Sequence, residues 1–458
     1  MLNRYNICMK TYRPYEPDQM FLMPPSLKEW LPENHLAYFV SDVVARMDLS
    51  AIEEVYTKEE RGYPPYHPVM MVKVLLYAYS TGVYSSRRIA RKVQEDVAFR
   101  ILAAGNQPDF RTISDFRKRH LEALKGLFVQ IVEICRKAGL VKLGHISLDG
   151  TKIKANASKH KAMSYMRMKK EESRLRQEIE ELLGRAEETD REEDRKYGKD
   201  RRGDELPEEL GRRESRLQKI QEAIKALEQE ARTKDSDNSR NSADDNDKVK
   251  RGRKSSAPKG IPKDSTQRNF TDPESRIMVD GDKAFIQGYN AQAAVDASSQ
   301  VIVAADVSSK SVDKQQVKPM VELIAEINGE YPEEVSADAG FFSTENVEWL
   351  QERNIGAYVA PDKQQHNDKI DVIPRGRIPG GLSVIELMRR KLKTKAGRKR
   401  YALRKQTVEP VFGQIKGARG FRQFLLRGID KVRGEWALLC SAHNLLKLYR
   451  AGEVGAPA

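Results

Sequence analysis

The sequence is poor in cysteine and histidine, the side chains that build disulfide frameworks and zinc sites. Its 458 residues include three cysteines and seven histidines. The cysteines, Cys8, Cys135 and Cys440, lie far apart and are expected to be ordinary reduced thiols. The chain has neither H-x-x-x-H nor C-x-x-C spacing, so a metal ion in this protein would be bound by oxygen atoms.

Long hydrophobic runs are also missing. No apolar stretch reaches the length of a membrane span. The first ten residues lack the apolar core of a secretion signal. These absences predict a cytoplasmic protein.

Positive charge is in excess. The formal net charge is +14 and the isoelectric point is near 9.4, with basic residues standing beside acidic ones throughout. This excess indicates a polyanionic partner, and nucleic acid is favoured over an anionic membrane. A chain of 458 residues is long enough for two or three domains with sizeable cores.

Residues 1–140 are predicted to form a helical N-terminal domain. Apolar residues between Leu36 and Met47 recur at helical spacing, and the stretch from Met70 to Tyr79 is apolar on nearly every side. Both patterns are typical of helices that pack into a core.

The same domain carries a basic surface. Ser85 is placed to cap a short basic helix. A later helix is expected to start at Thr112, with Asp115 three residues on, and to end at Gly139. The two helices suggest a helix-turn-helix that binds DNA. The candidate DNA contacts are Arg87, Arg88, Arg117, Lys118 and Arg119. A solvated basic face of a small helical bundle explains the pattern equally well.

The apolar period changes from helix to strand after Gly139, which marks a domain boundary near residue 141. Residues 141–160 and 271–450 are expected to form one α/β domain. Residues 161–270 interrupt it with a charged stretch whose leucine and isoleucine spacing predicts an antiparallel helical hairpin. The part from Thr233 to Gln267 is too polar to pack and is predicted to be a flexible linker.

The second part of the split domain alternates strands and helices. A strand hairpin at 288–296 and 300–306 is followed by a helix at 311–327 that stops at Asn328-Gly329, a strand at 334–338, a helix capped by Ser343, and a strand at 356–360. With the strand around Leu148, this order predicts a mixed sheet flanked by helices.

Asp149 lies in that first strand, where aspartate is uncommon. Ile146 and Leu148 face one way and Asp149 the other, as in a half-buried strand. Taken by itself, the stretch is explained best by a strand-end aspartate before a turn at Gly150. A buried pair and a metal ligand are the alternatives.

Two further carboxylates favour the interpretation of Asp149 as a metal ligand. Asp338 is expected at the C-terminal end of a strand, the edge where open α/β sheets place ligands. Glu409 lies in a segment that Thr407 could cap as a helix, and Lys416, seven residues later, shares its face.

Three acids converging at a sheet edge would make an all-oxygen site suited to Mg²⁺ or Mn²⁺. Two such ions can activate a nucleophile and stabilise a leaving oxygen, so the predicted chemistry is phosphoryl transfer on DNA. Asp149 would bridge both ions, and Asp338 and Glu409 would each complete the ligands of one.

The segments around these acids resemble the DDE transposases of bacterial insertion sequences, in particular the IS1182 group within the IS4/IS5-like set. The resemblance rests on Leu148-Asp149-Gly150-Thr151-Lys152, Ala337-Asp338-Ala339-Gly340-Phe341 and the stretch from Val408 to Lys416, and extends over nearly the whole chain, including Tyr12-Arg13-Pro14-Tyr15 and Gly288-Tyr289-Asn290-Ala291-Gln292. It implies an RNase H-like catalytic domain that cleaves DNA and transfers the strand. It also implies a nucleoid-associated protein that binds terminal repeats and target DNA, as a homodimer when assembled on DNA.

The third segment departs from the related pattern, which is Tyr, two residues, Arg, three residues, Glu, six residues, Lys. Tyr401 and Arg404 keep the first interval, and Glu409 and Lys416 keep the last. Arg404 is one residue too far from Glu409, and Lys405 stands where the arginine is expected. Tyr401, Arg404, Lys405 and Lys416 are therefore all candidate contacts to DNA phosphate, and the identity of the phosphate-contacting arginine stays open. Pro410 is compatible with a helix only if the helix begins there.

Other polar residues on these elements are expected to be structural. Asp296 is interpreted as a hairpin-turn residue and Asp306 as a strand-end or helix-entry residue. His145 precedes the first strand, and His443 lies in an apolar helix as a satisfied core histidine.

Two other functions fit the same residues. A DNA-binding protein without catalysis would use the helical N-terminus and basic surface, with the acids as remnants. An RNase H-like nuclease would hydrolyse DNA without joining strands.

Overall fold

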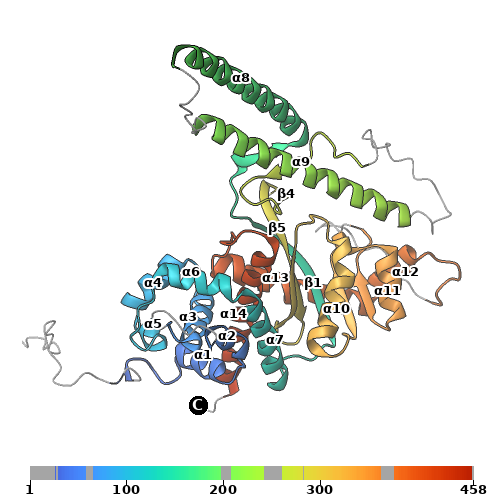
Figure 1. Ribbon diagram of the computed structural model, residues 1–458. Helices are drawn as coiled ribbons and strands as arrows, with labels where there is room; N and C mark the ends of the chain where they lie inside the picture. Colours follow the sequence, from blue (N-terminus) through green and yellow to red (C-terminus); the bar gives the residue numbers. More distant parts are fainter. Residues whose placement is uncertain are drawn as a thin grey trace, which may run out of the picture.

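The structure is a computed structural model that describes residues 26, 29–57, 65–197, 208–241, 260–281, 283–362 and 376–455. The N-terminal part of the described chain is helical, as the sequence predicts (Figure 1). Its helices are α1 (Leu36–Ala45), α2 (Ser50–Thr57), α3 (Pro68–Ser80), α4 (Ser86–Glu95), α5 (Val97–Leu102), α6 (Phe110–Arg119) and α7 (Leu121–Lys137). The segment Tyr12-Arg13-Pro14-Tyr15 lies outside the described residues.

The predicted start and length of the later basic helix are wrong. Helix α6 begins at Phe110 rather than Thr112, because Asp109 occupies the N-cap and its carboxylate accepts a hydrogen bond from the Arg111 N–H at 2.7 Å. The chain then leaves helical geometry at His120 (φ −106°, ψ 24°), so two helices stand where the sequence pattern suggested one.

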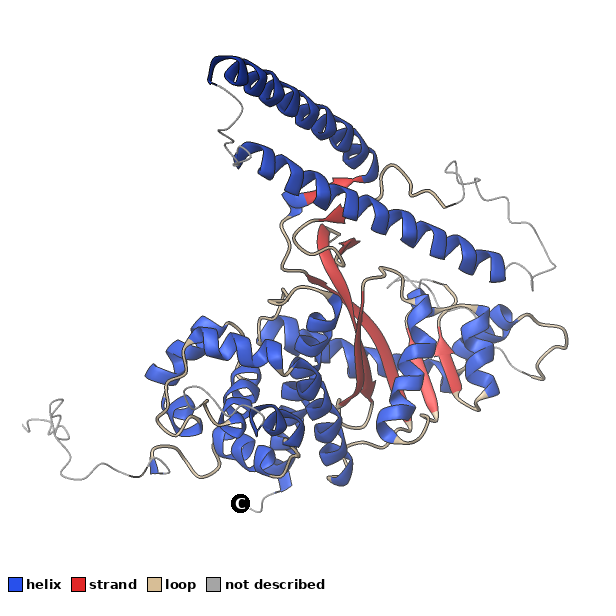
Figure 2. Cartoon of the chain, in the orientation of Figure 1, coloured by secondary structure: helices blue, strands red, loops and turns tan. Residues whose placement is uncertain are grey.

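A mixed sheet forms the centre of the molecule (Figure 2). The strands are β1 (His145–Lys154), β4 (Arg276–Val279), β5 (Phe285–Asp296), β6 (Ile302–Ser308), β7 (Glu334–Ala337) and β8 (Gly356–Val359). Strand β5 is antiparallel to β1, β4 and β6, whereas β7 is parallel to both β1 and β8. The order β6-β5-β1-β7-β8 therefore places β1 at the middle of the sheet.

Helices flank this sheet, which confirms the predicted arrangement. They are α10 (Val317–Asn328), α11 (Thr344–Glu352), α12 (Val384–Lys393), α13 (Lys395–Gly413) and α14 (Ile429–Gly455). Helix α13 packs against β1, β5, β7 and β8, while α10 packs against β5 and β6. The predicted helix signals also hold: Ser343 caps α11, and Gly329 ends α10 at φ 79°.

One buried core runs from the N-terminal helices through the sheet to α14. Helix α14 packs against α3, α7 and β6. Its Trp436 is fully buried and donates a hydrogen bond from Nε1 to the Gln292 carbonyl at 2.9 Å. The C-terminal helix thereby joins the N-terminal helices to the strands that carry the site.

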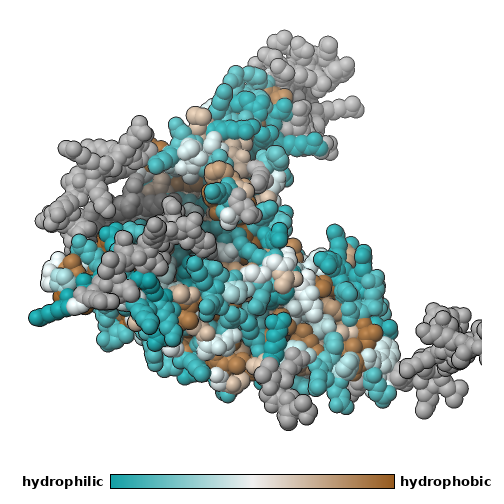
Figure 3. Space-filling view, turned by 180° about the vertical axis from the view of Figure 1, so that it is seen from behind, coloured by the Kyte–Doolittle hydropathy of each residue, from teal (hydrophilic) through white to brown (hydrophobic). Residues whose placement is uncertain are grey.

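The insertion consists largely of two long helices that lie beyond the end of β4 and β5 (Figure 1), and Figure 3 shows a largely hydrophilic surface on this upper part of the molecule. These are α8 (Tyr165–Tyr197) and α9 (Glu208–Asn241), and the antiparallel strands β2 (Ala162–Ser164) and β3 (Gln267–Asn269) pair at their base. A small separate cluster joins the helices: Tyr165, Met168 and Leu175 from α8 with Ile220, Ala223, Ile224 and Leu227 from α9. Helix α9 continues to Asn241, so the linker predicted from Thr233 begins too early, and residues 242–259 of that prediction lie outside the described residues.

Within the described residues, no helix combines the length and the apolar character needed to cross a bilayer.

Candidate active site

Asp149 lies within the central strand rather than at its end. Strand β1 continues through Gly150 to Lys154, with Asp149 opposite Ala293 and Gly150 opposite Gln292. The explanation of Asp149 as a strand-end residue before a turn is therefore wrong. Its side chain is 18% exposed, in contrast to the fully buried Leu148 beside it.

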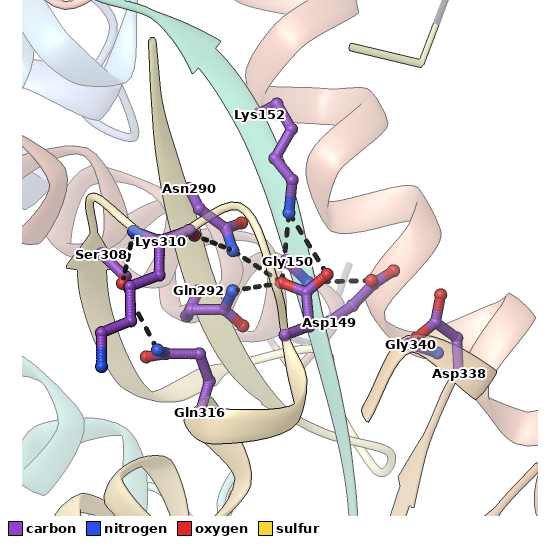
Figure 4. Close-up of polar contacts among 11 residues, drawn as sticks. Asp149, Gly150, Lys152, Asn290, Gln292, Ser308, Lys310, Gln316, Asp338 and Gly340 are labelled. Atoms are coloured by element: carbon purple, nitrogen blue, oxygen red, sulfur yellow. Dashed lines mark hydrogen bonds and ion pairs between the residues drawn. The ribbon is translucent and has the colours of Figure 1, made fainter. Parts of the chain in front are cut away.

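The surroundings of Asp149 disfavour its negative charge. Burial and the neighbouring charge of Asp338 raise its pKa to about 7, although Arg404 acts in the opposite direction. Figure 4 shows the Asp149 side chain directed toward the strand that leads into Asp338. An aspartate in the middle of a sheet with a pKa raised in this way is a candidate for cation binding or catalysis.

Asp338 directly follows β7, the parallel neighbour of β1. Its Oδ1 accepts a hydrogen bond from the Gly340 N–H at 2.8 Å and so caps the short 3-10 helix η4 (Ala339–Phe341). The side chain is therefore fixed at the end of a strand, where the sequence placed it.

Glu409 lies in α13, whose Val408, Val411 and Phe412 are buried. The predicted cap at Thr407 is wrong, because the helix already begins at Lys395 with Thr394 at its N-cap. Thr407 instead lies inside the helix and donates its hydroxyl hydrogen to the Leu403 carbonyl at 2.7 Å.

Pro410 sits inside α13 and does not end it. Proline has no N–H, so the Gln406 carbonyl lacks its usual partner one turn later. Gln300 supplies the missing donor, since its Nε2 lies 2.8 Å from that carbonyl oxygen. This contact from the β5–β6 connection keeps the carbonyl paired and lets Glu409 occupy a helical position.

Arg404 connects the acid of the central strand to the acid of α13. One guanidinium nitrogen lies 3.6 Å from Asp149 Oδ2 and another lies 3.3 Å from Glu409 Oε1. Its side chain is 14% exposed, whereas that of Glu409 is 48% exposed. Three acids that are far apart in the sequence are thus gathered around one arginine and one strand end.

The other residues of the third motif take different positions. Tyr401 is half-buried, with the Arg404 guanidinium carbon 5.9 Å from its ring centre. Lys405 is exposed, so Arg404 and not Lys405 turns toward the acids. Lys416 lies in the π-helical turn η5 (Gln414–Ala418), and its Nζ donates to the Lys152 carbonyl at 2.9 Å.

Sequence reasoning missed a polar network beside Asp149. Asp313 accepts hydrogen bonds at Oδ1 from Asn290 Nδ2 (2.6 Å) and Gln292 Nε2 (2.9 Å), and it forms an ion pair with Lys152 (3.1 Å). Figure 4 shows Lys152, Asn290 and Gln292 converging on one point next to Asp149. The alternate polar residues Asn290 and Gln292 in a buried strand were the available signal.

The N-terminal basic residues separate into two groups. Arg87, Arg88, Lys118 and Arg119 are exposed on α4 and α6. Arg117 is 4% exposed and donates hydrogen bonds to the Tyr79 hydroxyl (2.8 Å) and the Tyr84 carbonyl (3.1 Å). Its selection as a surface DNA contact is corrected, because its guanidinium lies inside the fold.

Asp296 and Asp306 have structural partners. Asp296 is almost fully buried and its Oδ2 accepts the N–H groups of Lys142 and Leu143, both at 2.9 Å. Asp306 lies within β6, not at its end, and is paired with Arg433 at 2.8 Å.

The two histidines also have structural partners. His145 is the first residue of β1, and its Nδ1 lies 2.9 Å from Glu334 Oε2. His443 is buried, which lowers its pKa to about 3, and its Nε2 lies 3.0 Å from the Gln300 carbonyl oxygen. Their interpretation as structural residues is confirmed.

No three of the described His, Cys, Asp and Glu side chains already stand close enough together to hold a metal ion. Arg404 accounts for part of this, since its guanidinium lies between Asp149 and Glu409. The donor chemistry nevertheless fits a hard divalent cation: the acids offer only oxygen atoms, and burial together with the charge of Asp338 raises the pKa of Asp149, which a bound cation would oppose.

Family comparisons decide what this site belongs to. Residues 25–119 match a family described as a transposase domain (DUF772), and residues 258–445 match the transposase DDE domain. The chain belongs to the DDE transposases. Comparison with curated proteins and with solved structures gave no match.

As a DDE transposase, the protein binds DNA, cleaves it and transfers the cleaved strand, and its family generally uses divalent metal ions. The DDE match includes Asp338, Glu409 and Lys416 but begins at residue 258, near the end of the insertion, so Asp149 lies outside it. The sheet brings Asp149 into this transposase domain, because β1 pairs with β5 on one side and β7 on the other.

Proposed function

We propose that Asp149, Asp338 and Glu409 are the catalytic acids of this transposase. The observation that carries the proposal is the position of Arg404, which lies within ion-pair distance of Asp149 and Glu409. Asp338 belongs to the same group because its charge raises the pKa of Asp149. No other set of acids in the described chain joins β1, the end of β7 and α13 in this way.

The same three side chains would hold two divalent cations, Mg²⁺ or Mn²⁺. Such ions, when bound, activate a water or 3′-hydroxyl and stabilise the leaving oxygen of a phosphoryl transfer. Asp149 is coupled to Asp338 through its raised pKa and to Glu409 through their shared partner Arg404, so it would bridge both ions. Asp338, fixed by Gly340, and Glu409, held by α13, would each serve one of them.

Cationic side chains and one tyrosine around the acids would bind the DNA backbone. We assign Lys416, Arg404, Tyr401 and Lys405 to the strand being cleaved, with Arg404 the arginine nearest the acids. The exposed residues Arg87, Arg88, Lys118 and Arg119 on α4 and α6 would hold a terminal repeat. Charged contacts of this kind position DNA without reading its sequence.

The fold family, the domain boundaries and the transposase group are part of the same proposal. The strand order β6-β5-β1-β7-β8, with three antiparallel strands followed by two parallel ones, supports an RNase H-like catalytic domain formed by residues 141–160 and 271–450. Residues 1–140 would be the DNA-binding domain, and residues 161–270 a helical-hairpin insertion with a linker. We place the protein in the IS1182 group, acting in the bacterial cytoplasm at the nucleoid as a homodimer on DNA.

Cleavage of the element's own ends tests the assignment. Asp149→Asn, Asp338→Asn and Glu409→Gln should each lower Mg²⁺-dependent cleavage at least 100-fold, the order expected when a group acting on the reacting atoms is lost. End binding in a gel-shift assay should remain close to that of the unchanged protein. The matched control is Asp306→Asn, whose acid is paired with Arg433 of α14. Cleavage at an ordinary rate by Asp149→Asn would refute the assignment.

A further inference from the structure

Asp313 is a fourth acid at the site, and the three-acid assignment gives it no role. It stands at the N-cap of the 3-10 helix η3 (Lys314–Gln316), directly before α10. Its side chain is 20% exposed, and its charge contributes to the raised pKa of Asp149. Helix α10 packs on β5 and β6, so Asp313 reaches the site from a different element than Glu409 on α13.

One oxygen of Asp313 is fixed by the surrounding side chains. Oδ1 receives hydrogen bonds from Asn290 Nδ2 at 2.6 Å, Gln292 Nε2 at 2.9 Å and Lys152 Nζ at 3.1 Å. Oδ2 is contacted by the same Lys152 ammonium at 3.2 Å. Asp313 is thus held rigidly through Oδ1, while Oδ2 has a single hydrogen-bond donor among the described residues.

Two glycines make room for this arrangement. A Cβ atom at Gly150 would lie only 2.8 Å from Asp313 Oδ1 and 2.4 Å from Gln292 Nε2. A Cβ atom at Gly340 would lie 2.9 Å from Asp338 Oδ1 and 3.6 Å from Asp313 Oδ2. Asp338 Oδ1 and Asp313 Oδ2 therefore both lie close to the point where a Gly340 Cβ would stand, while Asp313 Oδ1 lies beside Gly150.

Asn290, which holds Asp313 Oδ1, has an unpartnered oxygen of its own beside Gly150. Asn290 is fully buried, and both hydrogens of its amide are used, by Asp313 and by the Lys310 carbonyl. Those donors fix the orientation of the amide, which leaves Asn290 Oδ1 without a hydrogen-bond partner. This oxygen lies 2.9 Å from the point where a Gly150 Cβ would stand. A buried acceptor without a donor is costly unless a water or a cation completes it.

We propose that Asp313 is a fourth carboxylate of the divalent-cation site, binding through Oδ2 beside Asp338, while Asn290 and Gln292 hold its Oδ1 in place. This rests on the proposed role of Asp149 and Asp338 as metal ligands. In the absence of the cation, the Lys152 ammonium balances the charge of Asp313. Cation binding releases Lys152 from Oδ2, and the ammonium is then free to face a DNA phosphate.

Binding of Mn²⁺ to the full chain without DNA tests the proposal. Free Mn²⁺ is followed by electron paramagnetic resonance during titration, so no cleavage is needed. Asp313→Asn should weaken binding of one Mn²⁺ at least about tenfold, as expected for loss of a group in a metal site. Lys152→Gln should leave the affinity equal or higher. Asp306→Asn is the matched control, since Asp306 is a similarly ion-paired aspartate on β6.

The outcomes separate this inference from the three-acid assignment. Ordinary Mn²⁺ binding by Asp313→Asn, together with weakened binding by Asp149→Asn, would overturn the role of Asp313 and leave the three acids in place. Equal losses of cleavage in Asp313→Asn and Lys152→Gln without a change in Mn²⁺ affinity would also overturn it, since Asp313 would then only position Lys152. Ordinary Mn²⁺ binding by Asp149→Asn would instead count against the three-acid assignment.

Crystals of the unchanged protein soaked in Mn²⁺ give a test that does not depend on a variant folding. Anomalous scattering should place a Mn²⁺ ion about 2 Å from Asp313 Oδ2, the distance at which small divalent ions bind carboxylates. Ions bound at Asp149 and Asp338 but remote from Asp313 would contradict the proposal.

Discussion

The guanidinium of Arg404 lies 3.6 Å from the Asp149 carboxylate, and the same side chain lies 3.3 Å from Glu409. A positive charge thus already stands between two of the acids to which we assign the metal. A divalent cation shared by these acids would compete with Arg404 for the same negative potential. Arg404 would then be released toward the DNA backbone, where a planar guanidinium binds phosphate well.

Removing the Arg404 charge should therefore strengthen metal binding and weaken catalysis. We expect Arg404→Gln to bind Mn²⁺ roughly three- to tenfold more tightly at pH 8, about 1 kcal/mol for a partly screened charge. Cleavage of DNA ends should fall in the same variant, because a phosphate contact is lost. Calorimetric titration without DNA measures the first effect, and weaker Mn²⁺ binding by Arg404→Gln would contradict it.

The raised pKa of Asp149 should make the metal-free protein less stable at high pH. The pKa of Asp149 is about 7 in the folded protein against a reference value of 3.8. The resulting loss of unfolding free energy is therefore absent below pH 3.8 and grows until the pH passes 7. At 1.36 kcal/mol per pKa unit, the full penalty is on the order of 4 kcal/mol. Asp149→Asn should match the unchanged protein at pH 4 and exceed its unfolding free energy at pH 8. Denaturant unfolding in EDTA at pH 4 and pH 8 measures the unfolding free energies of both proteins. Equal unfolding free energies at pH 8 would contradict the raised pKa of Asp149.

Arg117 should matter for folding and not for DNA. Its contact with Tyr79 leads to the buried Glu435 of α14, whose Oε1 lies 3.5 Å from the Tyr79 hydroxyl. Burial raises the pKa of Glu435 and Arg117 lowers it, so Arg117→Met removes the cation that favours the charged form of Glu435 and should lower the unfolding free energy by about 3–5 kcal/mol. The exposed neighbour Arg119→Met should change stability by about 0.5 kcal/mol or less.

DNA binding separates the same two variants. Arg119→Met should reduce by about one the slope of log affinity against log salt, as expected when one phosphate contact is lost. Arg117→Met, measured well below its melting temperature, should keep the original slope. A reduced slope for Arg117→Met would show that Arg117 contacts DNA and would contradict this prediction.

Much of the fold could be predicted because its signals are local. The left-handed Gly329 after α10, the Ser343 cap of α11 and the alternation around Leu148 each act within a few residues. Predictions of helix starts were wrong where another residue capped the helix earlier in the chain. Thr407 has the side chain of a helix cap, but α13 had already started twelve residues earlier at Lys395.

The site was harder to predict because it depends on distant contacts. Glu409 could be selected from its motif, but the Gln300 contact that satisfies the Gln406 carbonyl comes from the β5–β6 connection and has no signature near Pro410. Asp313 was missed because its partners Lys152, Asn290 and Gln292 lie on two strands that meet only in the folded sheet. The buried position of Arg117 likewise follows from packing of α6 on its neighbours, which a basic sequence pattern does not reveal.

Exchange of the metal ion tests the central claim most directly. Asp149→Cys and Asp338→Cys replace a hard oxygen ligand by sulfur, which Mg²⁺ accepts poorly and Mn²⁺ accepts better. If these acids bind the catalytic ions, both variants should lose cleavage of DNA ends in Mg²⁺ and regain a measurable part of it in Mn²⁺, while Asp306→Cys cleaves in both. Cleavage in Mg²⁺ by either of the first two variants at the rate of the unchanged protein would contradict the account.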